Sequence, residues 1–131
     1  MYIPYGKHTI NETDIDAVVE VLRSPYLTQG PAVQDFEEAI AARVWASHSV
    51  ASNSATSALH LACLALNLGP GDLLWTTPIT FVASANCARY CGAEVDFVDI
   101  DPRTGLMSEK GLEEKLEQAA KRGRLPKILV P

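Results

Sequence analysis

The sequence predicts an α/β fold built on a mainly parallel sheet, and three observations lead to this prediction. Helix-like and strand-like segments alternate along the 131 residues. The strand-like segments are separated by helices, which implies crossover connections and therefore parallel strands. The composition, with 47% hydrophobic and 21% charged residues, is that of an ordinary globular protein.

Two helices are expected before the sheet. The first begins after Asn11, a capping residue with Asp14 three positions on, and ends before Pro25, which disfavours helical geometry in the residue preceding it. Residues 26–30 are expected to form a loop, and Pro31 suits the first turn of the second helix. The apolar faces of the two helices consist of Ile15, Val18, Val19, Leu22 and of Val33, Phe36, Ile40, Val44.

The middle of the chain is expected to form a strand, a turn, a helix and a second strand. Residues 49–51 form a short strand-like stretch, and residues 52–54 form a polar turn. A third helix begins at Ala55 and is ended by the Gly-Pro-Gly sequence at 69–71. Residues 73–76 are the next expected strand.

The last part of the chain continues the alternation. A fourth helix is expected over residues 81–90 and a strand over 94–100. Residues 101–105 have the composition of a turn, and Ser108 can cap a fifth helix. Residues 127–130 are expected to be a last, buried strand.

Charge and hydropathy exclude several classes of function. Eleven basic and sixteen acidic residues give a net charge of −5, which argues against nucleic acid or an anionic membrane as the main partner. The longest apolar run, residues 61–66, is too short to span a bilayer, and no leader-like segment opens the sequence. We therefore expect a soluble, cytoplasmic protein.

Three groups of residues have some character of a metal site, and in each the structural interpretation is favoured. The cysteines lie in apolar helical surroundings, Asp101 precedes a proline turn while Asp96 is expected to face solvent on a strand, and the histidines share no ligand spacing. The groups are Cys63, Cys87 and Cys91; Asp96, Asp99 and Asp101; and His8, His48 and His60. We expect no metal site.

The segment SNSATSALHLAC at residues 52–63 is the first candidate binding site. A turn that leads into a helix presents free backbone N–H groups at the positive end of the helix dipole, which suits phosphate. Ala55 and Thr56 offer backbone donors, and Ser54 and Thr56 add hydroxyls. The alternative is that Asn53 or Ser54 only caps the helix, since the turn lacks the glycines of a P-loop.

The segment TTPITFVASAN at residues 76–86 is the second candidate site. Ligands of parallel sheets bind beyond the carboxyl ends of the strands, and Pro78 follows such an end. Phe81 is placed to stack on a planar ring, the alternative being an ordinary core phenylalanine. Together the two segments suit a flat, phosphorylated ligand.

The sequence carries six motifs that resemble the DegT/DnrJ/EryC1 family of sugar aminotransferases, which use pyridoxal 5'-phosphate (PLP). The motifs are YLTQGP (26–31), FEEAIA (36–41), NSATSALH (53–60), GPGD (69–72), TTPITFVASAN (76–86) and VDIDPRT (98–104). Their order and spacing cover nearly all of the chain. Within the family, they look most like the transaminase branch of pseudaminic acid biosynthesis.

The resemblance implies a fold, a reaction and a set of site residues. The fold would be that of PLP-dependent transferases of type I, which is aspartate aminotransferase-like, and the protein would be a homodimer. The reaction would move an amino group from glutamate to C4 of a UDP-linked 4-keto-6-deoxy-N-acetyl-hexosamine. Ser54, Ala55 and Thr56 would hold the PLP phosphate, and Phe81 would stack on the pyridine ring. The substrate would contact Tyr5, Pro25, Tyr26, Leu27, Thr28 and Ala55.

One departure from the family concerns the catalytic lysine. PLP chemistry needs a lysine that forms the Schiff base and a carboxylate opposite the pyridinium nitrogen. None of the five lysines of the chain matches the family's lysine motif, so no catalytic residue is assigned. We expect a truncated chain, with a helix and substrate loop over 1–30 and the N-terminal part of the PLP-binding large domain over 31–131.

Alone, such a chain is not expected to catalyse transamination. Two other functions stay open at this point. One is a non-catalytic domain that binds PLP or a nucleotide sugar without the lysine. The other is a Rossmann-like oxidoreductase domain, against which the absence of a G-x-G-x-x-G turn counts.

Overall fold

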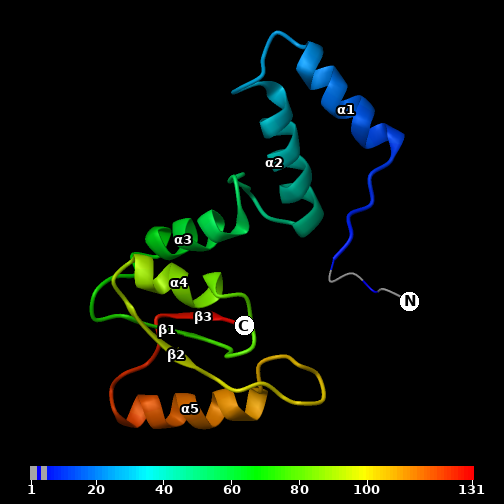
Figure 1. The fold of residues 1–131 in the computed structure, drawn as a ribbon. Helices are drawn as coiled ribbons and strands as arrows, with labels where there is room; N and C mark the ends of the chain where they lie inside the picture. Colours follow the sequence, from blue (N-terminus) through cyan, green and yellow to red (C-terminus); the bar gives the residue numbers. More distant parts are fainter. Residues whose placement is uncertain (1–2, 4–5) are drawn as a thin grey trace. The chain divides into compact units, whose positions relative to one another are not determined.

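The structure of the chain is a computed structural model that describes residue 3 and residues 6–131. Tyr5, expected to contact the substrate, lies outside the described residues. The chain divides into two compact units, residues 1–51 and residues 52–131. Figure 1 shows two helices, α1 and α2, in the first unit and the sheet with its helices in the second.

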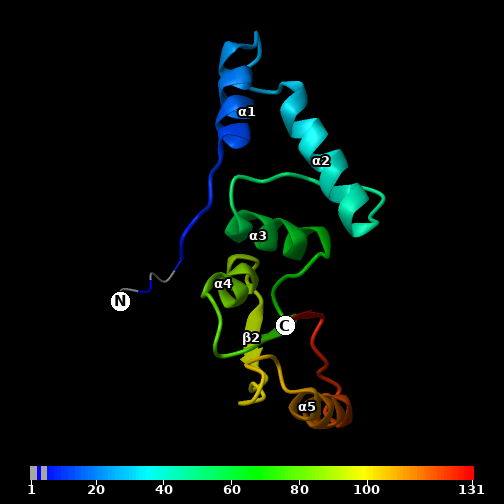
Figure 2. The ribbon, with the colours of Figure 1, turned by 90° about the vertical axis from the view of Figure 1, so that its right-hand side faces the viewer.

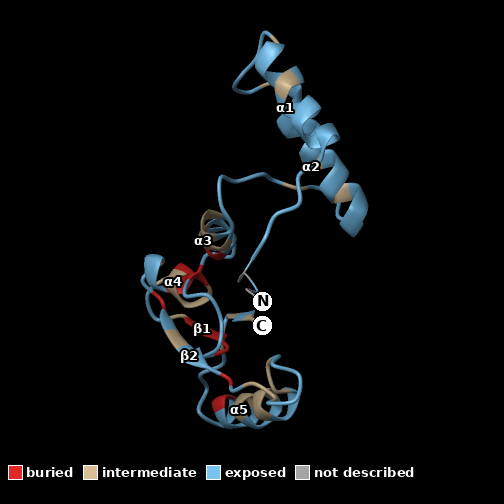
Figure 3. Cartoon of the chain, turned by 45° about the vertical axis from the view of Figure 1, so that its right-hand side comes forward, coloured by how far each residue is buried: buried red, intermediate tan, exposed pale blue. Residues whose placement is uncertain are grey.

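The first unit holds α1 (Glu12–Arg23) and α2 (Pro31–Val44), as the sequence predicts. Asn11 and Asp14 form a reciprocal capping box: each side chain accepts a hydrogen bond from the other residue's backbone N–H, at 3.1 and 2.9 Å. Helix α2 ends at Trp45, whose φ of 53° is left-handed. The apolar faces of both helices are largely exposed (Figure 3).

The predicted strand at residues 49–51 is wrong. These residues are extended but irregular, and Val50 is 82% exposed. The N–H of Ala51 donates to the Glu37 carboxylate at 2.7 Å rather than to a strand. A strand needs a neighbour that supplies backbone partners, and among the described residues none pairs with this segment.

The second unit follows the predicted alternation of helices and strands. Its elements are α3 (Ala55–Ala65), β1 (Leu73–Thr76), α4 (Ala83–Tyr90), β2 (Glu94–Phe97), α5 (Glu109–Lys121) and β3 (Ile128–Val130). The strands form one parallel sheet in the order β2-β1-β3, which confirms the predicted α/β fold and parallel pairing. Two boundaries differ: α4 begins after residue 81, and β2 stops before Ile100, which makes an isolated antiparallel bridge with Met107.

Helices cover both faces of the sheet. Helices α3 and α4 lie on one face and α5 on the other (Figures 1 and 2). The alternation along β1 divides the core accordingly: Leu74 packs with Cys63 and Cys87, whereas Leu73 and Trp75 pack on the α5 side. Strand β1 is therefore buried on both faces, whereas β3, expected to be buried, is only partly so.

Candidate functional site

The first candidate site lies where the parallel strands end. In Figure 1 all three strands run toward the same side of the second unit, and α3, α4 and α5 begin on that side. The predicted phosphate segment and the segment that carries Phe81 thus meet the same edge of the sheet. Ligands of open α/β sheets bind at this edge.

Ser54 determines how α3 begins. Its backbone is extended, with φ −162° and ψ 155°, and its hydroxyl accepts a hydrogen bond from the Ser57 N–H at 3.1 Å. The Ser57 hydroxyl donates to the Asn53 amide oxygen at 2.8 Å, which ties the turn together. The capping alternative is therefore correct for Ser54, because its hydroxyl is occupied within the turn.

The cap leaves the two predicted backbone donors available. The part of the chain that the structure describes offers no hydrogen-bond acceptor to the N–H groups of Ala55 or Thr56. Ala55 is exposed and Thr56 is half-buried, and the first turn of α3 contains no acidic residue. Two free N–H groups at the positive end of an 11-residue helix form a site for an anion. Capping and anion binding are compatible here.

Phe81 lies in the connection from β1 to α4, immediately before the N-cap residue Val82. Its side chain is 73% exposed, so the core alternative is wrong. Its carbonyl accepts the Ser84 N–H at 3.0 Å, and the Thr80 and Ser84 hydroxyls are 3.2 Å apart. The first turn of α4 thus anchors the backbone of Phe81 while its ring remains available to a ligand.

A hollow that the sequence pattern does not predict lies beside this connection. It has a volume of about 340 Å³ and is lined by Thr77, Ile79, Thr80, Gly105, Leu106, Met107 and Pro131. Thr77 and Pro131 directly follow β1 and β3. Position after a strand end is the signal that could have identified these residues, since the carboxyl ends of parallel strands converge.

The predicted substrate loop belongs to the first unit. The loop joins α1 to α2, and its residues 26–30 line a hollow of about 540 Å³ between these helices, with Tyr26, Leu27 and Thr28 among its walls. Pro25 does not line this hollow. The Ser24 hydroxyl fixes the loop by donating to the Tyr26 carbonyl at 3.0 Å and accepting the Tyr26 N–H at 3.2 Å. Tyr26 and Leu27 are exposed.

Two lysines form ion pairs with carboxylates that are distant in the sequence. Lys115 pairs with Asp96 at 2.7 Å, and Lys127 pairs with Asp72 at 2.8 Å. The hydrogen bond from Lys127, with one from the Gly69 N–H, lowers the pKa of Asp72 below its ordinary value. Both lysines neutralise a neighbouring carboxylate, which is a structural role.

Thiols and metal ligands give no further site. Burial and the neighbouring Cys87 thiol raise the pKa of Cys63 to about 12, so the thiol stays protonated. Cys63 and Cys87 are buried, as expected. No group of three or more His, Cys, Asp and Glu within the described ranges is arranged to hold a metal ion.

None of the helices that the structure describes combines the length and apolarity needed to cross a membrane.

Comparisons with known proteins agree with this fold. The sequence model of the DegT/DnrJ/EryC1/StrS aminotransferase family matches residues 8–123. A relative from Campylobacter jejuni, named UDP-4-amino-4,6-dideoxy-N-acetyl-beta-L-altrosamine transaminase, is 45% identical over 114 residues, which are 87% of this chain and 30% of the relative. The chain thus spans about 30% of the length of that curated relative.

Solved structures give the same result. A sugar aminotransferase from Streptococcus pneumoniae in its PLP form is 35% identical, with a TM-score of 0.78 over 86% of this chain and 29% of that protein. A Helicobacter pylori aminotransferase involved in pseudaminic acid biosynthesis is 37% identical, with a TM-score of 0.75 over 85% of this chain and 30% of that protein. The expected PLP-dependent transferase fold is confirmed.

Proposed function

The chain belongs to the DegT/DnrJ/EryC1/StrS aminotransferase family, and from this premise we propose that it is the N-terminal portion of a nucleotide-sugar aminotransferase. The whole protein uses PLP to transfer an amino group from glutamate to C4 of a UDP-linked 4-keto-6-deoxy-N-acetyl-hexosamine. It acts in the cytoplasm as a homodimer, in the biosynthesis of pseudaminic acid or a related amino sugar. The similarity to the C. jejuni and H. pylori proteins supports this substrate and pathway.

The observation that carries the proposal is the start of α3. PLP has a phosphate and a flat ring. This chain has N–H groups without a partner among the described residues at Ala55 and Thr56 and an exposed ring at Phe81, just before α4. Helices α3 and α4 begin on the same side of the sheet (Figure 1). The residues therefore fit the cofactor. A hydrogen bond to a charged group contributes about 1.5 to 3 kcal/mol, so two such bonds are enough to fix the phosphate.

PLP, when bound, supplies the electron sink and the carrier of the amino group. In our proposal, the backbone of Ala55 and Thr56 holds the phosphate, and the Thr56 hydroxyl adds a donor. Ser54 keeps α3 in position through its bond to Ser57. Phe81 stacks on the ring and excludes water from one side of it.

We propose that the substrate loop binds the nucleotide sugar and takes no part in the transfer of the amino group. Tyr26, Leu27 and Thr28 line a hollow of the first unit, which is consistent with a role in holding the nucleotide sugar. We propose the same role for Pro25, for Tyr5 and for the exposed Ala55. The reactive lysine and the carboxylate for the pyridinium come from parts of the protein beyond these residues.

The experiment that tests the cofactor site is an absorbance titration of the whole protein with PLP. We expect Thr56→Ala combined with Phe81→Ala to weaken binding by at least about tenfold, which corresponds to the loss of one charged hydrogen bond. The matched control is Thr104→Ala combined with Phe97→Ala, in the 101–105 turn and in β2. Equal PLP affinity in the two double variants would show that Thr56 and Phe81 do not form the PLP site.

The reaction itself is tested separately by mass spectrometry. The whole protein, loaded with PLP, is incubated with glutamate and the UDP-linked keto-sugar, and the expected product is the 4-amino sugar. A protein that binds PLP normally but forms no amino sugar and no oxoglutarate would support the alternative of a non-catalytic PLP- or nucleotide-sugar-binding protein.

A further inference from the structure

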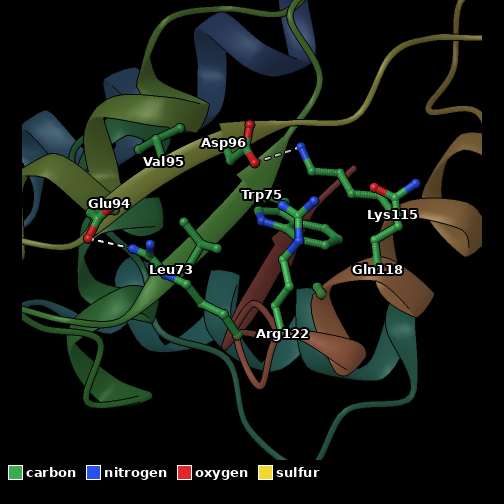
Figure 4. Close-up of a pocket in the computed structure, with 10 residues that line it drawn as sticks. Leu73, Trp75, Glu94, Val95, Asp96, Lys115, Gln118 and Arg122 are labelled. Atoms are coloured by element: carbon green, nitrogen blue, oxygen red, sulfur yellow. Dashed lines mark ion pairs between the residues drawn. The ribbon is translucent and has the colours of Figure 1, made fainter.

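A second hollow lies on the opposite face of the sheet from α3, between β1, β2 and α5 (Figure 4). Its volume is about 270 Å³, and its walls combine charged, polar and apolar side chains. Leu73 and Ala119 provide the apolar part, whereas the Val95 side chain packs on the α3 and α4 side of the sheet. The proposed function assigns no role to this hollow.

Two ion pairs join β2 to α5 and its C-terminal end across the hollow. Lys115 meets Asp96 at 2.7 Å, and Arg124 meets Glu94 at 2.6 Å. Each acidic residue of the hollow is thus paired with one basic residue. The third basic residue, Arg122, lines the hollow and makes no ion pair within the described part of the chain. Figure 4 shows its side chain extending from the end of α5 toward Trp75. The hollow therefore carries one uncompensated positive charge.

Trp75 provides a second, independent observation. The residue is 2% exposed, and its indole N–H is buried with no hydrogen-bond partner in the described structure. A buried polar group without a partner costs about 1 to 3 kcal/mol. Lys115 Nζ lies 4.8 Å from the centre of the ring, on the side of the hollow. An acceptor atom that entered here would satisfy the indole N–H.

We propose that this hollow is a binding site for a small organic anion, one that bears a single carboxylate or phosphate group on a compact planar or apolar body. Arg122 pairs with the oxyanion through its forked guanidinium, and the Trp75 N–H donates to one of its oxygens. The body of the ligand contacts Leu73 and Ala119. The volume, slightly below the usual range of about 300 to 1,000 Å³ for ligand pockets, limits the occupant to a small metabolite.

The flexible side chains at the rim move when the ligand binds. The indole N–H is buried, so the oxyanion reaches it only when side chains that line the hollow, such as those of Arg122 and Gln118, change position. Arg122 follows the last turn of α5 as its C-cap, so its side chain rearranges without disturbing the helix. The two ion pairs stay in place, because they are formed by Lys115 and Arg124 and do not involve the side chains that move.

The test follows the indole N–H signal of Trp75 by nitrogen-15 NMR of the whole protein, assigned through Trp75→Phe. The probes are benzoate, phenyl phosphate and the neutral benzyl alcohol. The indole of Trp45, in the first unit and 95% exposed, is an internal reference. We expect a saturable shift of the Trp75 signal with at least one anion, and no saturable shift with benzyl alcohol or at Trp45.

Three variants separate the site from general charge effects. Arg122→Gln should weaken anion binding by about tenfold or more, as expected for the loss of a charged pair, and Arg122→Lys should retain part of the affinity. Lys121→Gln, the matched control, removes a charge from α5 outside the hollow and should change the affinity less than twofold.

The outcomes are distinct. Binding of benzoate alone identifies a carboxylate ligand, and binding of phenyl phosphate alone identifies a phosphate ligand. The proposal is overturned if neither anion shifts the Trp75 signal saturably. It is also overturned if benzyl alcohol shifts the signal equally, or if Arg122→Gln and Lys121→Gln bind the anion alike.

Discussion

Ala55→Pro removes one proposed phosphate donor without removing the helix that carries it. Ala55 is the first residue of α3, where proline is tolerated because the missing N–H has no partner inside the helix. The preceding residue, Ser54, has φ −162° and ψ 155°, the extended geometry that proline requires before it. The substitution therefore deletes the Ala55 N–H and leaves the cap of α3 in place.

The expected magnitude follows from the lost hydrogen bond. A bond between a backbone N–H and a charged phosphate contributes about 1.5 to 3 kcal/mol. Since about 1.4 kcal/mol corresponds to a tenfold change, PLP binding should weaken by about 10- to 150-fold.

The assay is the absorbance titration of the whole protein with PLP. The matched control is Glu109→Pro at the first residue of α5, which follows the extended cap residue Ser108. This control should leave PLP affinity unchanged, and circular dichroism should show the same helix content in both variants. An Ala55→Pro protein that keeps its helix content and binds PLP within twofold of the parent would refute the reasoning.

Three further predictions concern the second unit. Leu74→Ala should lower the free energy of unfolding by about 3 kcal/mol in urea titrations because Leu74 is fully buried, whereas Leu64→Ala, at a half-exposed site, should cost about 1 kcal/mol or less. Lys127→Met should destabilise the protein at pH 6, and its effect should diminish as the pH is lowered below 3.8. Since the pKa of Asp72 is lowered from 3.8 in the folded state, the stabilisation is present above that value and is lost as the pH falls through the folded pKa. Cys63 should resist a thiol reagent at pH 8 until the protein unfolds, because its pKa of about 12 keeps it protonated; rapid labelling of native Cys63 would contradict this.

Local signals in the sequence were enough to locate most of the elements. Asn11, Ser54 and Ser108 each begin a helix as predicted, because a cap depends only on residues within one turn. The strand at 73–76 was also predicted with its observed boundaries, since a short apolar run between turns has few other structures available.

Features that depend on distant residues could not be predicted in this way. The stretch at 49–51 has the pattern of a strand, but strand formation depends on a neighbour that the pattern does not reveal. Likewise, only the fold brings Lys115 to Asp96 and over Trp75, because these residues are distant in the sequence.

The candidate site was predictable for a related reason. Ala55 and Thr56 act through backbone groups whose availability follows from their position at a helix start, which the sequence reveals. The second hollow was not predictable, because Trp75 and Arg122 are far apart in the sequence and meet only when α5 packs on the sheet.

A crystal structure of the whole protein with PLP would locate the cofactor phosphate directly. We expect phosphate oxygens within hydrogen-bond distance of the Ala55 and Thr56 backbone nitrogens, and the ring of Phe81 stacked on the pyridine ring. A PLP phosphate bound away from the start of α3, with both of these N–H groups left to solvent, would contradict this expectation.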